Sequence, residues 1–272
     1  MSRSFEHVIM TRFNLATPGK ESSIRNRAGW LEGRFDLFEK YCLPSVAAQS
    51  SSRFKWIIYF DEGTPAIFRS KIESLRRVFP FIPYYTGLFP ASGWPRSIVE
   101  TFDFKTDALL STRLDNDDAL ASDFVERLHS EIVKYATTDG AYNFENGFIL
   151  SNGKLYCLKH PSNAFFSFLA PYGEHMTTAP SIQHMELFRH GKIHQIGGTG
   201  GWMQIVHGGN VSNKIRGLRV SSTALNDYFP ETVLNDLIPT SPSTLLFDNT
   251  ISGSARGVRD IALFLRHLLK RI

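Results

Sequence analysis

The fold of this 272-residue chain is most constrained by an unbroken apolar run, WIIYF, at residues 56–60. Five consecutive apolar side chains leave no face of a strand for solvent, which is typical of an interior strand buried on both faces of a parallel sheet. Asp61 follows the run directly, and Gly63 and Pro65 then favour a turn. The run therefore predicts an interior strand of an α/β fold that ends in a carboxylate.

Strand and helix patterns alternate along the first half of the chain. Besides the strand above, the spacing of apolar residues predicts strands at residues 7–13 and 107–115 and helices at residues 34–50, 65–79 and 119–136. The resulting order of strand, helix, strand, helix, strand, helix predicts an α/β layered sheet with helices on both faces.

The second half of the chain is less regular and richer in loops. Residues 140–160 predict a hairpin, because two apolar runs are joined by Ser151-Asn152-Gly153, a strong turn signal. The length allows two domains, but α/β folds of this size are often single. We therefore predict one domain over residues 1–272.

Composition and charge exclude several classes of protein. The net charge of +4 is too mild to indicate a nucleic-acid partner, although it slightly favours anionic ligands. Cys42 and Cys157 show no CxxC and no Cys/His ligand spacing, which is typical of two thiols in a reducing compartment. No segment has the apolar length of a signal peptide or a membrane span. We expect a cytoplasmic protein, either free or peripheral on the inner membrane face.

Three carboxylates directly follow the predicted third strand, in LLSTRLDNDDAL at residues 109–120. Asp115 and Asp117 alternate along an extended backbone, so both would project to the same side. They would stand at the carboxyl end of a sheet strand, where open α/β sheets bind ligands. Two oxygen donors there favour Mg²⁺ or Mn²⁺, with water and substrate phosphates as the remaining ligands. The cluster therefore predicts a site for a cation and a nucleoside diphosphate.

Two other interpretations of these aspartates stay open. Asp117 or, more readily, Asp118 could cap the helix that follows, because aspartate is a preferred N-cap. A phosphoryl-transferring hydrolase also uses strand-end aspartates. Its nucleophile usually lies on the first strand, however, and here that strand ends in TRFN, residues 11–14.

Several segments resemble the GT-A nucleotide-sugar glycosyltransferases. The segment CLPSVAAQSSSRFKWIIYFDEGT, residues 42–64, is similar to their nucleoside-binding segment, and LDNDD at residues 114–118 is similar to their DxD motif. Together with TRFN and WMQIVHGGNVSN, residues 202–213, these segments are most similar to the rhamnosyltransferase group, over residues 8–213. The resemblance implies a GT-A-like, Rossmann-related sheet, a nucleoside-diphosphate sugar donor, Mn²⁺ or Mg²⁺, and a glycan or lipid-linked acceptor.

The resemblance also implies roles for individual residues. Asp115 would face the ribose and the metal, Asp117 would bind the metal directly, and His207 would complete the metal shell. Asp61 would hydrogen-bond the nucleobase or ribose, or else cap the turn before Gly63.

Further donor contacts are implied on the first and third strands. Arg12 and Asn14 would line the base pocket, although a surface arginine is an equally simple account of Arg12. Arg113 would pair with a phosphate through its planar guanidinium fork, or else neutralise a neighbouring aspartate. Trp202 would stack on a sugar or, more readily, belong to the core.

An inverting transferase needs a carboxylate beside the acceptor hydroxyl to take its proton. We predict Glu174 for this role, since it lies on a loop beside Gly173, with Glu186 and Asp227 as rivals. The resemblance divides most of the chain into a nucleotide-sugar-binding half, 1–125, and an acceptor-side half, 126–253. The pattern of apolar and basic residues at 254–272 predicts a C-terminal basic amphipathic helix.

The C-terminal helix has two interpretations: a helix packed on the domain, or a membrane-surface contact through anionic lipids. Two functions also compete with glycosyl transfer. One is a metal-dependent phosphotransferase or nucleotidyltransferase that uses the same aspartates. The other is a catalytically silent module that binds a nucleotide or a glycan.

Overall fold

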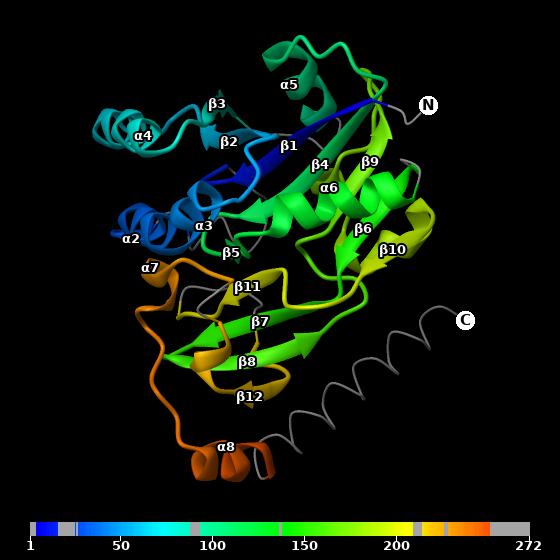
Figure 1. Cartoon of the computed structure of the whole chain (residues 1–272). Helices are drawn as coiled ribbons and strands as arrows, with labels where there is room; N and C mark the ends of the chain where they lie inside the picture. Colours follow the sequence, from blue (N-terminus) through cyan, green and yellow to red (C-terminus); the bar gives the residue numbers. More distant parts are fainter. Residues whose placement is uncertain are drawn as a thin grey trace.

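The computed structural model describes residues 4–15, 25, 27–87, 93–135, 138–208, 214–225 and 228–250. The predicted helix at 254–272 and the candidate base Asp227 lie outside these residues. Within the described part of the chain, no helix is both long enough and apolar enough to cross a bilayer. Two sheets and their covering helices make up the structure (Figure 1).

The larger sheet has seven strands in the order β10-β6-β9-β4-β1-β2-β3. Its strands are β1 (Phe5–Arg12), β2 (Lys55–Asp61), β3 (Ile82–Thr86), β4 (Ala108–Asp115), β6 (Gly140–Phe144), β9 (Ser167–Pro171) and β10 (Ile193–Ile196). Strands β4, β1, β2 and β3 run parallel, whereas β9 runs antiparallel to both β4 and β6. The predicted α/β fold class is therefore confirmed.

Strand β2 is the interior strand that its apolar sequence predicts, with β1 on one side and β3 on the other. The alternating side chains of β2 enter two different cores. Trp56, Ile58 and Phe60 belong to one, and Ile57 and Tyr59 belong to the other. Because both faces of the strand are buried, no polar position interrupts the run.

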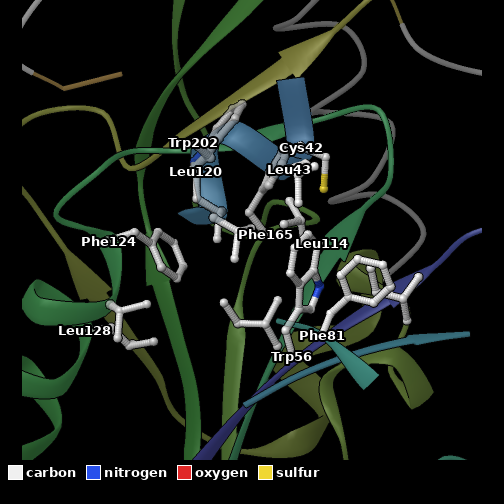
Figure 2. Packing of buried hydrophobic residues seen from close by; sticks show 14 of the residues in the cluster. Cys42, Leu43, Trp56, Phe81, Leu114, Leu120, Phe124, Leu128, Phe165 and Trp202 are labelled. Carbon is white, nitrogen blue, oxygen red and sulfur yellow. The ribbon is translucent and has the colours of Figure 1, made fainter. Parts of the chain in front are cut away.

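Helices cover both faces of this sheet, as predicted. One face packs against α2 (Trp30–Leu37), η1 (Phe38–Cys42), α3 (Leu43–Ala47), α4 (Ala66–Val78) and α6 (Phe124–Lys134). Figure 2 shows the dense core on that side, with Trp56 and Phe81 near Leu43 and Leu114. The other face packs against α5 (Gly93–Thr101).

The helix predicted over residues 34–50 contains one π-helical turn, η1, directly before Pro44. Proline cannot donate its backbone nitrogen, so the hydrogen-bond ladder has to change register at this point. Pro44 therefore stays inside a continuous helical segment instead of ending it.

The second sheet has five strands in the order β12-β8-β7-β11-β5. They are β5 (Ala119–Leu120), β7 (Asn146–Ser151), β8 (Lys154–Lys159), β11 (Trp202–Ile205) and β12 (Leu218–Val220). The predicted hairpin turn joins β7 to β8, with positive φ at Asn152 (48°) and Gly153 (72°), as a two-residue turn of this kind requires. The first arm of the hairpin differs from the prediction, because it divides between β6 in one sheet and β7 in the other.

Trp202 lies where the two sheets meet. Its ring stacks on Phe165 at 4.8 Å, its Nε1 donates to the Phe144 carbonyl at 2.9 Å, and only 2% of the residue is exposed. Trp202 is therefore a core residue, as the simpler interpretation predicted. The remaining elements are η2 (Ala179–Ser181), η3 (His184–His190), η4 (Ser222–Ala224), α7 (Glu231–Leu234) and α8 (Pro242–Asp248).

Candidate functional site

Polar residues gather at the carboxyl edge of the central sheet. In the strand register, Arg12 at the end of β1 lies beside Asp115 at the end of β4 and beside Tyr59 of β2. Asp61 ends β2 two residues further on. The carboxyl ends of parallel strands share one edge, so the fold brings Arg12, Asp61 and Asp115 to the same side of the sheet.

Asp115 is held by its neighbour on the strand. Arg113 Nη2 lies 3.0 Å from Asp115 Oδ2, and Arg113 Nε lies 3.3 Å from Oδ1. Burial raises the pKa of this carboxyl, but the guanidinium groups of Arg113, Arg12 and Arg34 outweigh burial and leave the pKa lowered. Asp115 is therefore a stable carboxylate that Arg113 partly neutralises.

A pocket opens beside this pair, on the face that α5 covers. Its lining combines two guanidinium groups, a carboxylate and an indole, and consists of Met10, Arg12, Trp94, Arg113, Asp115 and Pro180. Positive charge together with an aromatic surface suits an anionic ligand that carries a flat ring or a sugar.

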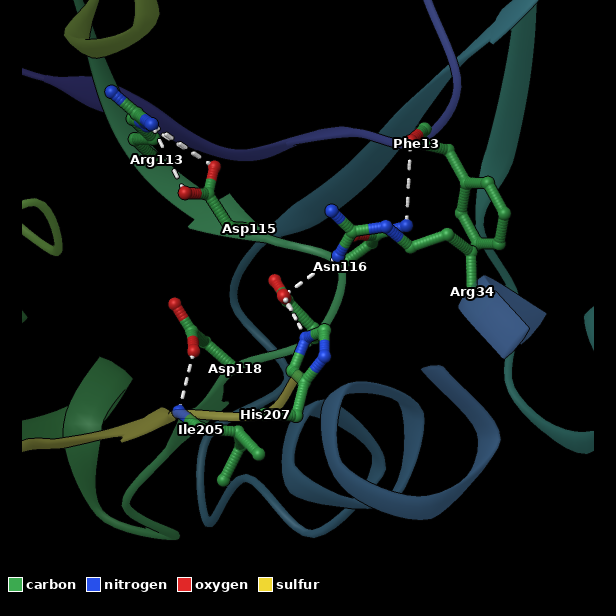
Figure 3. Close-up of polar contacts among 9 residues, drawn as sticks. Phe13, Arg34, Arg113, Asp115, Asn116, Asp118, Ile205 and His207 are labelled. Carbon is green, nitrogen blue, oxygen red and sulfur yellow. Dashed lines mark hydrogen bonds and ion pairs between the residues drawn. The ribbon is translucent and has the colours of Figure 1, made fainter. Parts of the chain in front are cut away.

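The chain turns sharply after Asp115. Strand β4 ends there, residues 116 and 117 form a turn, and the Asp118 N–H donates to the Asp115 carbonyl at 3.2 Å. The expectation that Asp115 and Asp117 alternate along one extended strand is therefore wrong. The turn directs the two carboxylates to separate sets of partners. Asp115 meets Arg113, and Asp117 meets His207, which lies below that pair in Figure 3.

Asp117 receives two donors on a single oxygen. Arg34 Nη1 lies 2.7 Å from Asp117 Oδ2, and His207 Nε2 lies 3.0 Å from the same atom. Only 7% of the Asp117 side chain is exposed. Arg34 comes from α2 and His207 follows β11, so the fold brings three distant segments together around this carboxylate.

Asp118 has a structural role. Its Oδ1 accepts the Ile205 N–H at 2.8 Å, which ties the turn to β11. Burial raises the pKa of this carboxyl well above its usual value, and the charges of Asp117 and Asp115 raise it further. The prediction that Asp117 or Asp118 caps the next helix is wrong, because α6 begins at Phe124 and Asp123 occupies the N-cap position.

Asp61 both closes a turn and binds an arginine. Its Oδ1 accepts the Gly63 N–H at 2.7 Å, which is the capping role considered from the sequence, and its Oδ2 lies 2.7 Å from Arg25 Nη2. Asn14 braces the same turn, accepting the Asp61 N–H at 3.0 Å and donating to Thr64 Oγ1 at 3.1 Å. Through these two hydrogen bonds, Asn14 helps to hold the turn that contains Asp61.

The loop that carries Glu174 begins at the opposite edge of the sheet. It lies in the loop after β9, and the last residue of β9, Pro171, pairs with Ala108 at the start of β4. Asp115 stands seven residues further along β4, a strand length of about 23 Å. Glu174 is exposed and interacts electrostatically with Arg96 of α5. The register of β9 therefore places the start of this loop at the opposite edge of the sheet, which weighs against Glu174 as the catalytic base.

The rival Glu186 lies in η3, where it pairs with Arg189 at 2.9 Å. The same element contributes His184, which the sequence interpretation missed. Burial first, and then nearby positive charges, with that of Arg113 the largest, lower the pKa of His184 to about 4. His184 is therefore a neutral imidazole near the Arg113–Asp115 pair.

Arg25 and Arg34 were also missed, because nothing in the local sequence separates them from surface arginines. Both come from the region between β1 and α3 and pair with the carboxylates of other strands. Only the tertiary fold shows that they face the edge of the sheet.

The donor set fits a divalent cation that shares its shell with a substrate. In the part of the chain that the structure describes, no group of three or more His, Cys, Asp or Glu side chains surrounds one metal position. Asp117 and His207 nevertheless place an oxygen and an imidazole nitrogen 3.0 Å apart. Mg²⁺ or Mn²⁺ needs only one or two protein carboxylates when phosphates and water complete the shell. The imidazole ligand favours Mn²⁺ over Mg²⁺.

A family model described as "Putative rhamnosyl transferase" matches residues 6–219. Two structures of S. aureus TarS 1–349, one in complex with UDP, share 8% and 10% identity with this chain and have TM-scores of 0.44 and 0.45. Each comparison covers 74% of this chain and 60% of the TarS chain. A nucleotide-diphospho-sugar transferase structure from Desulfovibrio desulfuricans G20 shares 12% identity over 74% of this chain and 81% of its own, with a TM-score of 0.35. No curated protein matches the sequence.

Proposed function

The chain belongs to the family described as "Putative rhamnosyl transferase", and on this basis we propose that it transfers a sugar from a nucleoside diphosphate to an acceptor hydroxyl. The sugar is proposed to be rhamnose or another deoxyhexose, which the family description supports. The acceptor is proposed to be a glycan or a glycolipid.

One observation carries this proposal: guanidinium groups and carboxylates alternate along the carboxyl edge of a parallel sheet. Arg12 and Arg113 line the pocket beside Asp115, and in the turn that follows β4 Asp117 meets His207. A ligand that satisfies both charge types would carry its own anionic groups and be bound together with a cation. A metal-bound diphosphate has this character.

Each of these side chains has a proposed role in holding the donor. Arg12 and Arg113 would bind the anionic oxygens of the diphosphate through their guanidinium forks. Asp117 and His207 would hold the divalent cation, which when bound supplies neutralisation of the leaving diphosphate. Asp61 would accept a hydrogen bond from the base or the ribose, with its carboxylate held in place by Gly63 and Arg25.

Trp94 supports the same assignment from the wall of the pocket. Its indole packs edge-on against Tyr59 at 4.7 Å and is 8% exposed, so its orientation is fixed by the core. An aromatic surface fixed in this way favours the flat face of a base or the apolar face of a sugar. Residues 126–253 are proposed to shape the acceptor side.

The reaction is tested by its by-product. The full-length protein would be incubated with a panel of nucleotide-sugars and Mn²⁺, and the nucleotide products separated by chromatography. Release of a nucleoside diphosphate supports glycosyl transfer. Release of a nucleoside monophosphate would instead show attack at phosphorus, and tight binding with no release would indicate a silent binding module.

A peripheral location on the inner membrane face is also proposed, from the basic and apolar pattern of residues 254–272. Flotation with anionic liposomes would compare the full chain with a truncation before Ser254. We expect only the full chain to float, and equal partitioning of the two would exclude this contact.

A further inference from the structure

Arg34 holds the carboxylate oxygen to which the proposed function assigns the cation. Its Nη1 lies 2.7 Å from Asp117 Oδ2, the oxygen that also meets His207, and 3.4 Å from Asn116 Oδ1. The Arg34 and Asp117 side chains are only 19% and 7% exposed. An ion pair this buried is screened by salt much less than a surface pair.

A guanidinium group and a divalent cation compete for this oxygen. Arginine stays protonated at all physiological pH values, so its charge cannot be removed by titration. Two positive groups at one oxygen repel each other, and the repulsion is strong where the surroundings exclude water. A cation bound at Asp117 Oδ2 therefore favours displacement of the Arg34 guanidinium.

The Arg34 guanidinium stays close to Asp117 even when it is displaced. Arg34 is anchored in α2, and its guanidinium carbon lies 5.5 Å from the centre of the Trp30 ring. A displaced guanidinium stays tethered within a side chain's length of the edge where the diphosphate is expected. Its planar fork matches phosphate oxygens as well as it matches a carboxylate.

We propose, building on the function proposed above, that Arg34 is a positioning residue that competes with the divalent cation for Asp117 Oδ2. Once the cation displaces it, Arg34 pairs with the diphosphate of the donor. The protein thereby binds the cation weakly by itself and strongly together with a diphosphate, so the two ligands bind as a unit.

This exchange predicts opposite effects of one substitution on two affinities. In Arg34→Gln the competitor is gone, so the affinity for Mn²⁺ alone should rise, on the order of tenfold. The same variant lacks the phosphate contact, so its affinity for pyrophosphate at saturating Mn²⁺ should fall, again on the order of tenfold. A side chain with a merely structural role would shift both affinities in the same direction.

The test is isothermal titration calorimetry of the full-length protein with two probes, Mn²⁺ alone and inorganic pyrophosphate with Mn²⁺. Arg34→Lys keeps the positive charge but lacks the fork, so it should bind Mn²⁺ alone like the wild type and bind pyrophosphate more weakly. Arg77→Gln removes one exposed charge from α4 and should change neither affinity. Melting temperatures of all variants check that each is folded, and Arg34→Lys carries the test if Arg34→Gln is unstable.

The outcomes separate this inference from the function on which it rests. Opposite shifts in Arg34→Gln support it. Unchanged or weaker Mn²⁺ binding in a stably folded Arg34→Gln overturns the competition, and unchanged pyrophosphate affinity overturns the phosphate contact. If the wild type shows no Mn²⁺ binding that Asp117→Asn removes, the proposed metal-dependent function fails together with the inference.

Discussion

Strands β1 and β4 carry two polar clusters of opposite character. At their carboxyl ends stand the charged groups Arg12, Arg113 and Asp115. In their interior, His7 Nε2 lies 2.8 Å from Thr112 Oγ1, and His7 Nδ1 lies 3.0 Å from His129 Nε2. The interior cluster is buried, whereas the charged groups at the strand ends are partly exposed, so the two clusters differ in both burial and charge.

The interior cluster is kept neutral. Burial lowers the pKa of His7 well below its usual value, and the neighbouring His129 lowers it further. Burial also lowers the pKa of His129 to about 4. A buried cluster of neutral hydrogen-bonding groups serves the stability of the fold.

The edge cluster instead keeps its charges. Asp115 and Asp117 stay paired with guanidinium groups that a ligand could replace. The comparison teaches that neutral polar groups inside these strands act on stability, and that charged groups at the end of the strands act on binding. Each prediction below tests one side of this division.

The largest effect is expected on the charged side. Asp117→Asn removes the charge that a cation needs, while keeping a side chain that Arg34 and His207 can contact. Mn²⁺-dependent binding of a nucleoside diphosphate should weaken at least a hundredfold, on the order of the loss of a metal ligand. Calorimetry measures this, and the melting temperature should change by only a few degrees. A large loss of stability with unchanged affinity would show that Asp117 acts on stability and not on binding, and would contradict this assignment.

The neutral cluster should make the protein sensitive to acid. Above pH 6.5 His129 is neutral in both the folded and unfolded states. Between pH 6.5 and about 4 the unfolded state binds a proton that the folded state does not, so the free energy of unfolding falls with falling pH. The full shift in the pKa of His129 corresponds to about 3 kcal/mol.

Urea unfolding at pH 7.5 and pH 4.5 measures this loss. His129→Gln should lose less stability between the two pH values than the wild type does. His190→Gln, which changes an exposed histidine, should behave like the wild type. Identical pH dependence in His129→Gln and the wild type would contradict the assignment.

A smaller effect is expected where the two sheets meet. A Cβ atom on Gly147 would lie 2.1 Å from the ring of Trp202, so Gly147→Ala should destabilise the fold by about 1–3 kcal/mol through overpacking. Gly173→Ala is the control, because a Cβ there meets nothing within 4 Å. Affinity for Mn²⁺ should stay the same in both variants, and a loss of Mn²⁺ binding in Gly147→Ala would show that packing and binding are not separate.

No effect is expected from Glu174→Gln, within about twofold in the rate of nucleoside diphosphate release. Glu174 is exposed, and it follows a strand that ends at the edge of the sheet away from Asp115. A rate reduced a hundredfold or more would instead show that Glu174 acts as the catalytic base.

The sequence predicts those parts of the molecule that depend on local patterns. The run at residues 56–60 predicts an interior strand because burial on both faces removes every polar position, and β2 is such a strand. The turn at Asn152-Gly153 is predicted because few residues accept positive φ. Asp115 could likewise be placed at the end of a parallel strand from the apolar residues before it.

The rest depends on how distant segments meet. The turn after Asp115 separates the two carboxylates. Asn and Asp favour turns, but they do not fix which partner each carboxylate meets. Arg34 and Asp117 lie 83 positions apart in the sequence. The pattern of the helix that carries Arg34 predicts only that the helix packs on the sheet, not that Arg34 meets a carboxylate. The position of Glu174 follows from the antiparallel pairing of β9, which single-sequence patterns do not fix.

The most direct test of the account is the position of a bound Mn²⁺ ion. Crystals of the protein grown with Mn²⁺ and a nucleoside diphosphate would be measured at a wavelength where manganese scatters anomalously. The account predicts one strong anomalous peak within coordination distance of Asp117 Oδ2 and His207 Nε2, with the diphosphate beside Arg12 and Arg113. A peak at any other place, with Arg34 still paired to Asp117, would contradict it.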